Sequence, residues 1–220
     1  EKVELLYQAH VQKIGWQDWK NSGEQAGTTG ESLRLEAFKI DLGTEEWNSQ
    51  IQYRAHVQSI GWQDWVNGGE VAGTIGESLR AEAMEIRLTG ELAEKYDIIY
   101  STHVSNIGDL DYVANGASAG SQGLGARMEA MVIRLVEKNS EDAPDTSGRG
   151  FVKEFSPEDL TYAAHVQRLG NLEAVTSGQT QGTTGQSLRV EGFCVNLDTT
   201  ALNALKSDIM YSAHVQNVGW

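Results

Sequence analysis

Hydrophobic and polar residues alternate over short stretches that recur along the chain. In residues 51–58, which read IQYRAHVQ, the side chains of Ile51, Tyr53, Ala55 and Val57 would point to one side and the polar side chains between them to the other. Alternation with a period of two residues predicts a β-strand with one buried face. Closely similar stretches begin near residues 5, 98, 160 and 209, so we expect this strand to recur in each of them.

The predicted strand opens a tandem repeat. Each of the 5 histidines lies three residues after a tyrosine, and the tyrosines begin four complete units of equal length at 7–42, 53–88, 100–135 and 162–197. A partial fifth unit occupies 211–220. Strict internal periodicity indicates units that cannot bury their own apolar face and need neighbours to complete a core.

The last segment of each unit predicts a second strand that contains an irregularity. In residues 78–88, SLRAEAMEIRL, Leu79, Ala81 and Ala83 are in phase, whereas Met84 and Ile86 are in the opposite phase. One extra residue in one strand of a pair forms a β-bulge. We therefore predict a bulge between Ala83 and Met84, and at the matching places 37/38, 130/131 and 192/193.

The spacing of the units predicts an all-β fold built from tandem repeats of about 47 residues. Three close-set units within 1–137 suit a β-trefoil-like domain with pseudo-threefold symmetry, followed by a linker or long loop at 138–158 and by the fourth unit and the partial fifth within 159–220. A small propeller or an open β array are the alternatives. Two connectors, TGELAEKYD at 89–97 and TTALNALKSD at 199–208, predict short helical turns.

Composition and charge exclude several classes of partner. The net charge of −14 repels phosphate backbones and anionic membrane surfaces, so we expect no nucleic acid. No apolar run reaches the roughly 18–20 residues that span a bilayer, so we expect no membrane insertion. The single cysteine, Cys194, allows neither an intramolecular disulfide nor a cysteine metal site. We expect no cofactor and no metal.

The tryptophans vary between units in a way that suggests a surface role. The position after the glycine of the IGW motif holds Trp16, Trp62, Asp109, Asn171 or Trp220. Truncating a buried tryptophan costs about 3–5 kcal/mol, so a position that accepts Asp and Asn is expected to lie outside the deep core. Exposed aromatic rings beside a turn can stack on sugars or anchor a protein partner. The predicted ligand-binding residues are Trp16, Trp19, Trp62, Trp65, Gln17, Asp18, Gln63 and Asp64.

The histidines point to structure and not to catalysis. Every complete unit contains one histidine and an Arg-x-Glu pair, including the units that have lost their tryptophans. A group needed in every copy is typical of a buried polar network whose members must satisfy each other. Carboxylate pairs suitable for glycoside hydrolysis are present, but none is unique to one unit. We therefore predict no catalytic residues and no enzyme activity.

The complete motif resembles a known family. Residues 53–88, YRAHVQSIGWQDWVNGGEVAGTIGESLRAEAMEIRL, are similar to the clostridial hydrophobic repeat with conserved tryptophan, ChW, through HVQ, IGW, a second tryptophan, AGTTG and LRxEA. Units three and four depart from IGW with IGD and LGN. The resemblance implies a secreted or cell-surface protein of a Gram-positive bacterium, with repeats that are often attached to enzymatic or adhesive modules.

These observations predict a non-catalytic binding module, secreted or at the cell surface, that recognises a glycan or a surface or host protein through the IGWQDW turns. The alternative is a structural spacer or assembly module in which the tryptophans pack between units. The last unit stops at Trp220, which fits either a truncated chain or a strand shared between molecules. Association with attached domains and self-association through this partial fifth repeat are the further partners expected.

Overall fold

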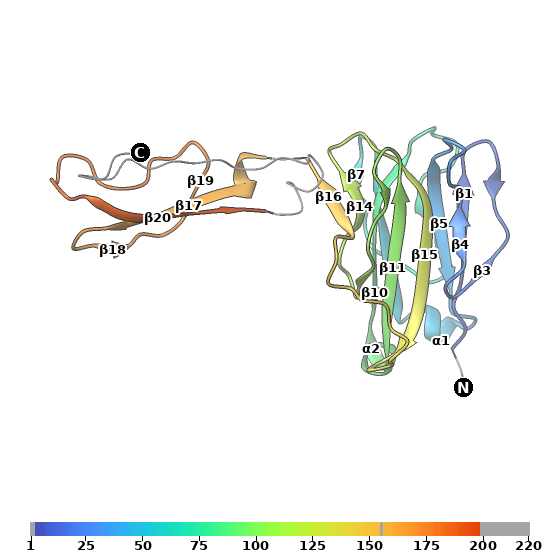
Figure 1. The fold of residues 1–220 in the computed structure, drawn as a ribbon. Helices are drawn as coiled ribbons and strands as arrows, with labels where there is room; N and C mark the ends of the chain where they lie inside the picture. The colour runs from blue at the N-terminus through green and yellow to red at the C-terminus, as the bar shows by residue number, and fades with distance from the viewer. Residues whose placement is uncertain (1–2, 155, 199–220) are drawn as a thin grey trace. The chain divides into compact units, whose positions relative to one another are not determined.

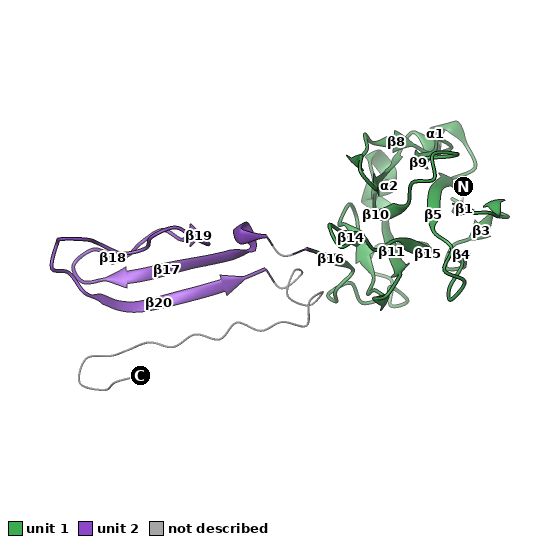
Figure 2. Ribbon diagram, turned by 90° about the horizontal axis from the view of Figure 1, so that it is seen from above, with its two compact units in different colours: residues 1–153 green, residues 154–220 purple. Residues whose placement is uncertain are grey.

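The computed structural model describes residues 3–154 and 156–198. The chain divides into two compact units, residues 1–153 and 154–220 (Figure 2). The first unit contains repeats one to three and the second contains repeat four. The predicted all-β fold with tandem repeats is confirmed by the strand content of both units.

Each of the first three repeats is built on one long antiparallel strand pair (Figure 1). These pairs are β1 (Leu6–Val11) with β5 (Leu35–Asp41), β6 (Ile51–Val57) with β10 (Ala81–Leu88), and β11 (Tyr96–Val104) with β15 (Met128–Glu137). Two short strands fold back onto the first strand of each pair. They are β2 (Gly15–Trp16) and β3 (Lys20–Asn21), β7 (Gly61–Trp62) and β8 (Val66–Asn67), and β12 (Gly108–Asp109) and β13 (Val113–Ala114).

Every sheet of the first unit is completed by a strand from another repeat. The donated strands are β4 (Gln25–Gly27), β9 (Ala72–Gly73) and β14 (Ala119–Gln122). Repeat two donates β9 to β5 of repeat one, and repeat three donates β14 to β10 of repeat two. Repeat one donates β4 to β15 of repeat three. The exchange therefore runs around a ring of three repeats that the first repeat closes.

This exchange differs from the expected trefoil. The described strands of the first unit form three separate open sheets, with orders β2-β1-β5-β9, β16-β14-β10-β6-β7 and β12-β11-β15-β4, where β16 is the strand Phe151–Lys153. The pseudo-threefold arrangement of repeats is present, but neither a trefoil nor a propeller is confirmed, because no described sheet closes on itself.

Each donated strand contains a glycine that close packing requires. The φ angles of Gly27, Gly73 and Gly120 are +99°, +103° and +116°. A Cβ atom on Gly27 or Gly73 would lie 2.3 Å from the carbonyl oxygen of Glu129 or Glu36 in the receiving repeat. Only glycine combines this conformation with so close an approach of two backbones.

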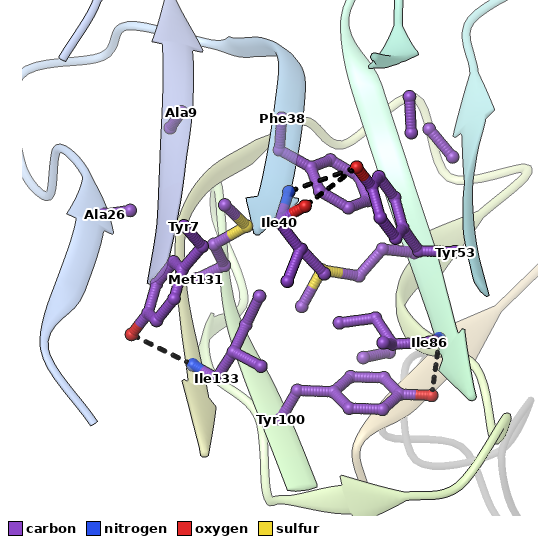
Figure 3. Close-up of a cluster of buried hydrophobic side chains, with 14 of the residues drawn as sticks. Tyr7, Ala9, Ala26, Phe38, Ile40, Tyr53, Ile86, Tyr100, Met131 and Ile133 are labelled. Atoms are coloured by element: carbon purple, nitrogen blue, oxygen red, sulfur yellow. Dashed lines mark hydrogen bonds between the residues drawn. The ribbon is translucent and has the colours of Figure 1, made fainter. Parts of the chain in front are cut away.

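The core of the ring is centred on the tyrosine that begins each repeat (Figure 3). Tyr7, Tyr53 and Tyr100 are fully buried. Their hydroxyl groups accept hydrogen bonds from backbone N–H groups of the neighbouring repeat: Ile133 to Tyr7 at 3.1 Å, Ile40 to Tyr53 at 3.1 Å and Ile86 to Tyr100 at 3.0 Å. Each hydroxyl also donates to a carbonyl of its own repeat, that of Glu24, Glu70 or Ala117. One side chain thus joins two repeats, and burial raises the pKa of Tyr7 to about 12.

The predicted bulge is present in all four repeats, but it lies earlier than the hydrophobic pattern indicates. In repeat two, Ala81 pairs with Val57 and Ala83 pairs with His56, so the extra residue is Glu82. The register shifts at the matching glutamates of the other repeats. The prediction at Ala83/Met84 was wrong because Ala83 does not face the core. It is buried because the donated strand β14 pairs with it, through Gly120.

Short elements lie between the repeats. Helix α2 (Gly90–Lys95) confirms the turn expected at 89–97. Helix α1 (Glu45–Asn48), which the sequence analysis did not anticipate, begins after Thr44, whose side chain caps it. The segment 138–158 contains β16 (Phe151–Lys153), which pairs in parallel with β14, and most of η1 (Pro157–Asp159). The helical turn expected at 199–208 lies outside the described residues.

Repeat four has the long strand pair and the two short strands of the other repeats, but no described strand at the place of β4, β9 and β14, and it exposes more of its apolar surface. Its sheet contains β17 (Leu160–Val166), β18 (Gly170–Asn171), β19 (Val175–Thr176) and β20 (Val190–Leu197). Val190 and Phe193 are 51% and 46% exposed, whereas Leu35 and Phe38 at the same positions of repeat one are 0% exposed. The partial fifth repeat, 211–220, lies outside the described residues.

Candidate binding surface

A cluster of histidine, arginine and glutamate lies on the outer face of each repeat. In repeat one, Nδ1 of His10 lies 3.2 Å from Oε2 of Glu36, and Nη2 of Arg34 lies 2.7 Å from Oε1 of the same carboxylate. Repeat two reproduces both distances with His56, Glu82 and Arg80. The glutamate is the bulged residue, which turns its side chain toward the same face as the histidine. The predicted polar network is therefore confirmed.

The carboxylate of Glu82 in repeat two is held in its charged form. Burial alone would raise the pKa of Glu82, but His56 and Arg80 beside the carboxylate outweigh burial and hold that pKa below its ordinary value. A charged glutamate that lies between a histidine and a hydrogen-bonded arginine is suited to structure and not to proton transfer.

The first tryptophan of each motif stands against this cluster. The ring of Trp16 meets His10 edge-on, with centroids 5.3 Å apart, and Trp62 meets His56 at the same distance. In repeats three and four the position holds Asp109 and Asn171, whose side-chain oxygens lie 2.7 Å from Nδ1 of the histidine. Each substitution thus keeps a contact with the histidine, which explains why the position tolerates Trp, Asp and Asn.

In repeat two, arginines order both tryptophans. The guanidinium of Arg54 lies 5.0 Å from the ring centre of Trp62 and 4.6 Å from that of Trp65, and Arg87 lies 4.0 Å from the ring centre of Trp65. Nε of Arg54 donates to Glu85 at 2.7 Å. Alternating cations and rings hold the two indoles in fixed orientations. The sequence analysis missed both arginines, although Arg54 lies on the outward-facing side of the alternating strand with His56.

The glutamines of the IGWQDW motif support the fold. Oε1 of Gln17 accepts a hydrogen bond from N–H of Gly27 at 2.7 Å, and its Nε2 donates to the carbonyl of Gly27 at 3.3 Å. Gln63 bonds Gly73 in the same way at 2.7 and 3.2 Å. Both amide groups thus fix the end of a donated strand, so they are not available to a ligand without breaking these bonds.

The remaining predicted residues lie at the surface, on two different sheets. Trp19 is 41% exposed, Asp18 and Asp64 are exposed, and Trp16, Trp62 and Trp65 are half-buried. In repeat two an open hollow of about 440 Å³ is lined by Trp62, Gln63, Asp64, Val66 and Val71. The structure therefore brings Trp62 and Asp64 together in one hollow, and its lining comes from repeat two alone.

Among residues 3–154 and 156–198, no group of three or more His, Cys, Asp or Glu side chains is placed to hold a metal ion. No helix among the described residues is long and apolar enough to cross a membrane.

The strand exchange and the recurring outer face define an all-β tandem-repeat protein. The family model Clostridial hydrophobic W, ChW, matches residues 10–43, 56–90, 103–137 and 165–198. The chain therefore belongs to the ChW family, which is not known as catalytic. No curated protein and no solved structure matches it.

Proposed function

We propose that the first unit is a non-catalytic carbohydrate-binding module of a secreted or cell-surface protein, and that repeat two carries its principal site. The open hollow in which Trp62 and Asp64 meet is the observation that supports this proposal. Repeat one offers a related surface at Trp16, Trp19 and Asp18.

The chemistry of the hollow suits a sugar ring. An indole presents a flat apolar face on which the C–H side of a sugar can stack, and a carboxylate accepts hydrogen bonds from hydroxyl groups. His56 and Arg54 hold the indole of Trp62 from two positions, with 5.3 Å between the ring centres and 5.0 Å from the guanidinium to the ring centre, so little side-chain freedom remains to be lost on binding. A fixed aromatic ring beside an exposed carboxylate, Asp64, supports glycan recognition.

The alternative, a spacer whose tryptophans pack between repeats, has less support. The ring and cation contacts of Trp16, Trp62 and Trp65 are all made with residues of their own repeat. The contacts that join one repeat to the next are made by the buried tyrosines and the donated strands.

A glycan array followed by titration calorimetry tests the proposal. For a glycan that binds the wild type, Trp62→Ala combined with Asp64→Ala is expected to weaken binding by about 2 kcal/mol, roughly thirtyfold, because an aromatic anchor is lost. Tyr112→Ala is the matched control, since Tyr112 occupies the position of Trp65 in repeat three, where Asp109 replaces the first tryptophan.

Unchanged affinity of the double variant would place the glycan site elsewhere. If no glycan on the array binds, and a purified surface protein binds the wild type but not Trp62→Ala, the ligand of this site is a protein and not a glycan.

A further inference from the structure

The first unit shows what each ChW repeat needs from its neighbours. Each repeat donates the short segment that contains its Ala-Gly sequence to the sheet of another repeat. It receives such a segment on its own second long strand. Past the glycine, the chain bonds to the bulged glutamate of the receiving repeat: N–H of Thr28 donates to the carbonyl of Glu129 at 2.8 Å, and Thr74 to Glu36 at 2.9 Å. The donated segment therefore covers the polar cluster.

Repeat four retains a segment shaped for donation. Residues 181–185, QGTTG, match residues 26–30, AGTTG. Gly182 has a φ of +124°, a positive angle close to the +116° of Gly120 in the donated strand β14. A Cβ on Gly182 would meet, among the described residues, only a methyl group of Val190 of the same repeat, at 3.6 Å. Gly182 thus has the positive φ of the glycines in the donated strands, but it lacks the close approach to another backbone that they make in the first three repeats.

Repeat four also exposes the surface that a donated segment covers elsewhere. The side chain of Glu191 is 36% exposed, against 9% for Glu36, and that of Arg189 is 68% exposed, against 19% for Arg34. Val190 is 51% exposed. An open hollow of about 410 Å³ lies against Gly192, which corresponds to Ala37, a residue that pairs with donated Gly73 in repeat one.

The internal geometry of repeat four matches that of the repeats in the ring. Its long strands pair from Leu160 opposite Leu197 to Val166 opposite Val190, with the same shift at Glu191. Tyr162 donates to the carbonyl of Gln179, as Tyr7 does to Glu24. A repeat donates its short strand from one surface and receives a strand on another, so copies of such a repeat associate head to tail. In the first unit this head-to-tail arrangement forms a closed ring of three repeats.

We propose that this chain forms a homotrimer through repeat four, with residues 181–183 of each copy added to β20 of the next copy. Gly182 then lies opposite Gly192 of the neighbouring copy, as Gly73 lies opposite Ala37 in the first unit. The third copy donates to the first and closes the ring. The occupant of the exposed surface is thus a second copy of this chain, and the contact is distinct from the self-association expected through 211–220.

The molar mass in solution tests the proposal. Light scattering coupled to size exclusion is expected to give three times the 24.1 kDa of one chain, with dissociation on dilution. Val190→Asp is expected to give the mass of a single chain, because Leu35 and Met128, at the same position of the closed ring, are fully buried. Since Val190 is exposed within its own repeat, the charge does not disturb the isolated fold.

Leu169→Asp is the matched control, because it makes the same kind of change at a side chain that is 50% exposed and does not line this hollow, and the matching Ile14 and Ile60 stay 50% and 52% exposed in the ring. It is expected to remain trimeric. Gly182→Val tests the donated segment. At the matching Gly27, Gly73 and Gly120 of the ring, a Cβ would lie 2.3–2.5 Å from a carbonyl oxygen of the receiving repeat, so this variant is also expected to be monomeric. A single-chain mass for the wild type at every concentration, or equal masses for the wild type and Val190→Asp, would overturn the proposal.

Discussion

The hydroxyl group of Tyr53 offers the most direct test of how the repeats are held together. It accepts from N–H of Ile40 at 3.1 Å and donates to the carbonyl of Glu70 at 2.5 Å, and the whole side chain is buried. Tyr53→Phe keeps the ring but removes both bonds. Tyr162→Phe is the matched control, because Tyr162 is only half-buried and its hydroxyl donates to Gln179.

The expected cost follows from the groups left behind. A hydrogen bond contributes about 0.5–1.5 kcal/mol, and a buried donor left without a partner costs about 1–3 kcal/mol. Loss of the hydroxyl leaves N–H of Ile40 buried at the joint between repeats one and two, so we expect Tyr53→Phe to lower the free energy of unfolding by about 2–4 kcal/mol. Tyr162→Phe is expected to cost about 1 kcal/mol, because water can replace a half-buried hydroxyl.

Urea unfolding followed by tryptophan fluorescence measures this difference. Five of the 6 tryptophans, at positions 16, 19, 47, 62 and 65, lie in the first unit, so the signal reports mainly on the ring. Far-ultraviolet circular dichroism follows the strands of both units, so the part of its change that does not coincide with the fluorescence transition reports on the second unit, which the control requires. Equal costs for the two variants, or a cost for Tyr53→Phe below about 0.5 kcal/mol, would refute the view that the tyrosines bridge repeats.

Two further predictions address the donated strand and the buried tyrosines. Gly73→Val is expected to lower the free energy of unfolding in urea by at least about 3 kcal/mol, because its Cβ would lie 2.3 Å from the carbonyl oxygen of Glu36. Gly76→Val is the control: Gly76 has a φ of +80° but open space around it, so the cost should be only about 1–2 kcal/mol. Similar costs for the two variants would argue against the close approach. Because burial raises the pKa of Tyr7 from 10.0 to about 12, the neutral phenol stabilises the folded state, and this contribution is complete below pH 10 and lost as the pH rises toward 12. Unfolding midpoints measured across this range should fall for the wild type, and Tyr7→Phe should flatten the fall.

The sequence predicts the repeated parts of the structure well. Alternation placed the first long strand of each repeat and the buried face of Tyr53, Ala55 and Val57 correctly. The recurrence of Arg-x-Glu with histidine predicted the polar cluster, because only a group with a structural role survives in copies that lose their tryptophans. These features depend on local periodicity and on comparison within the chain.

The features that sequence analysis missed depend on contacts between repeats. The donated strand β9 contains only Ala72 and Gly73, too short a stretch for alternation to indicate a strand or its partner. The bulge was misplaced because Ala83 is covered by such a strand. The amides of Gln17 and Gln63, which were predicted to contribute to a ligand site, bond Gly27 and Gly73 of their own repeats, at the ends of the strands donated to other repeats, and no pattern in the motif indicates this use.

The bond between Ile133 and Tyr7, which closes the ring, spans 126 positions of the chain. During synthesis on the ribosome, Tyr7 and the donated strand β4 of the first repeat therefore cannot make their native contacts until the third repeat has been synthesised. Duplication or deletion of one repeat would leave a sheet without its edge strand and an edge strand without its sheet. We expect chains built on this exchange to gain and lose repeats in groups of three, or to recruit further copies of themselves when the number does not fit.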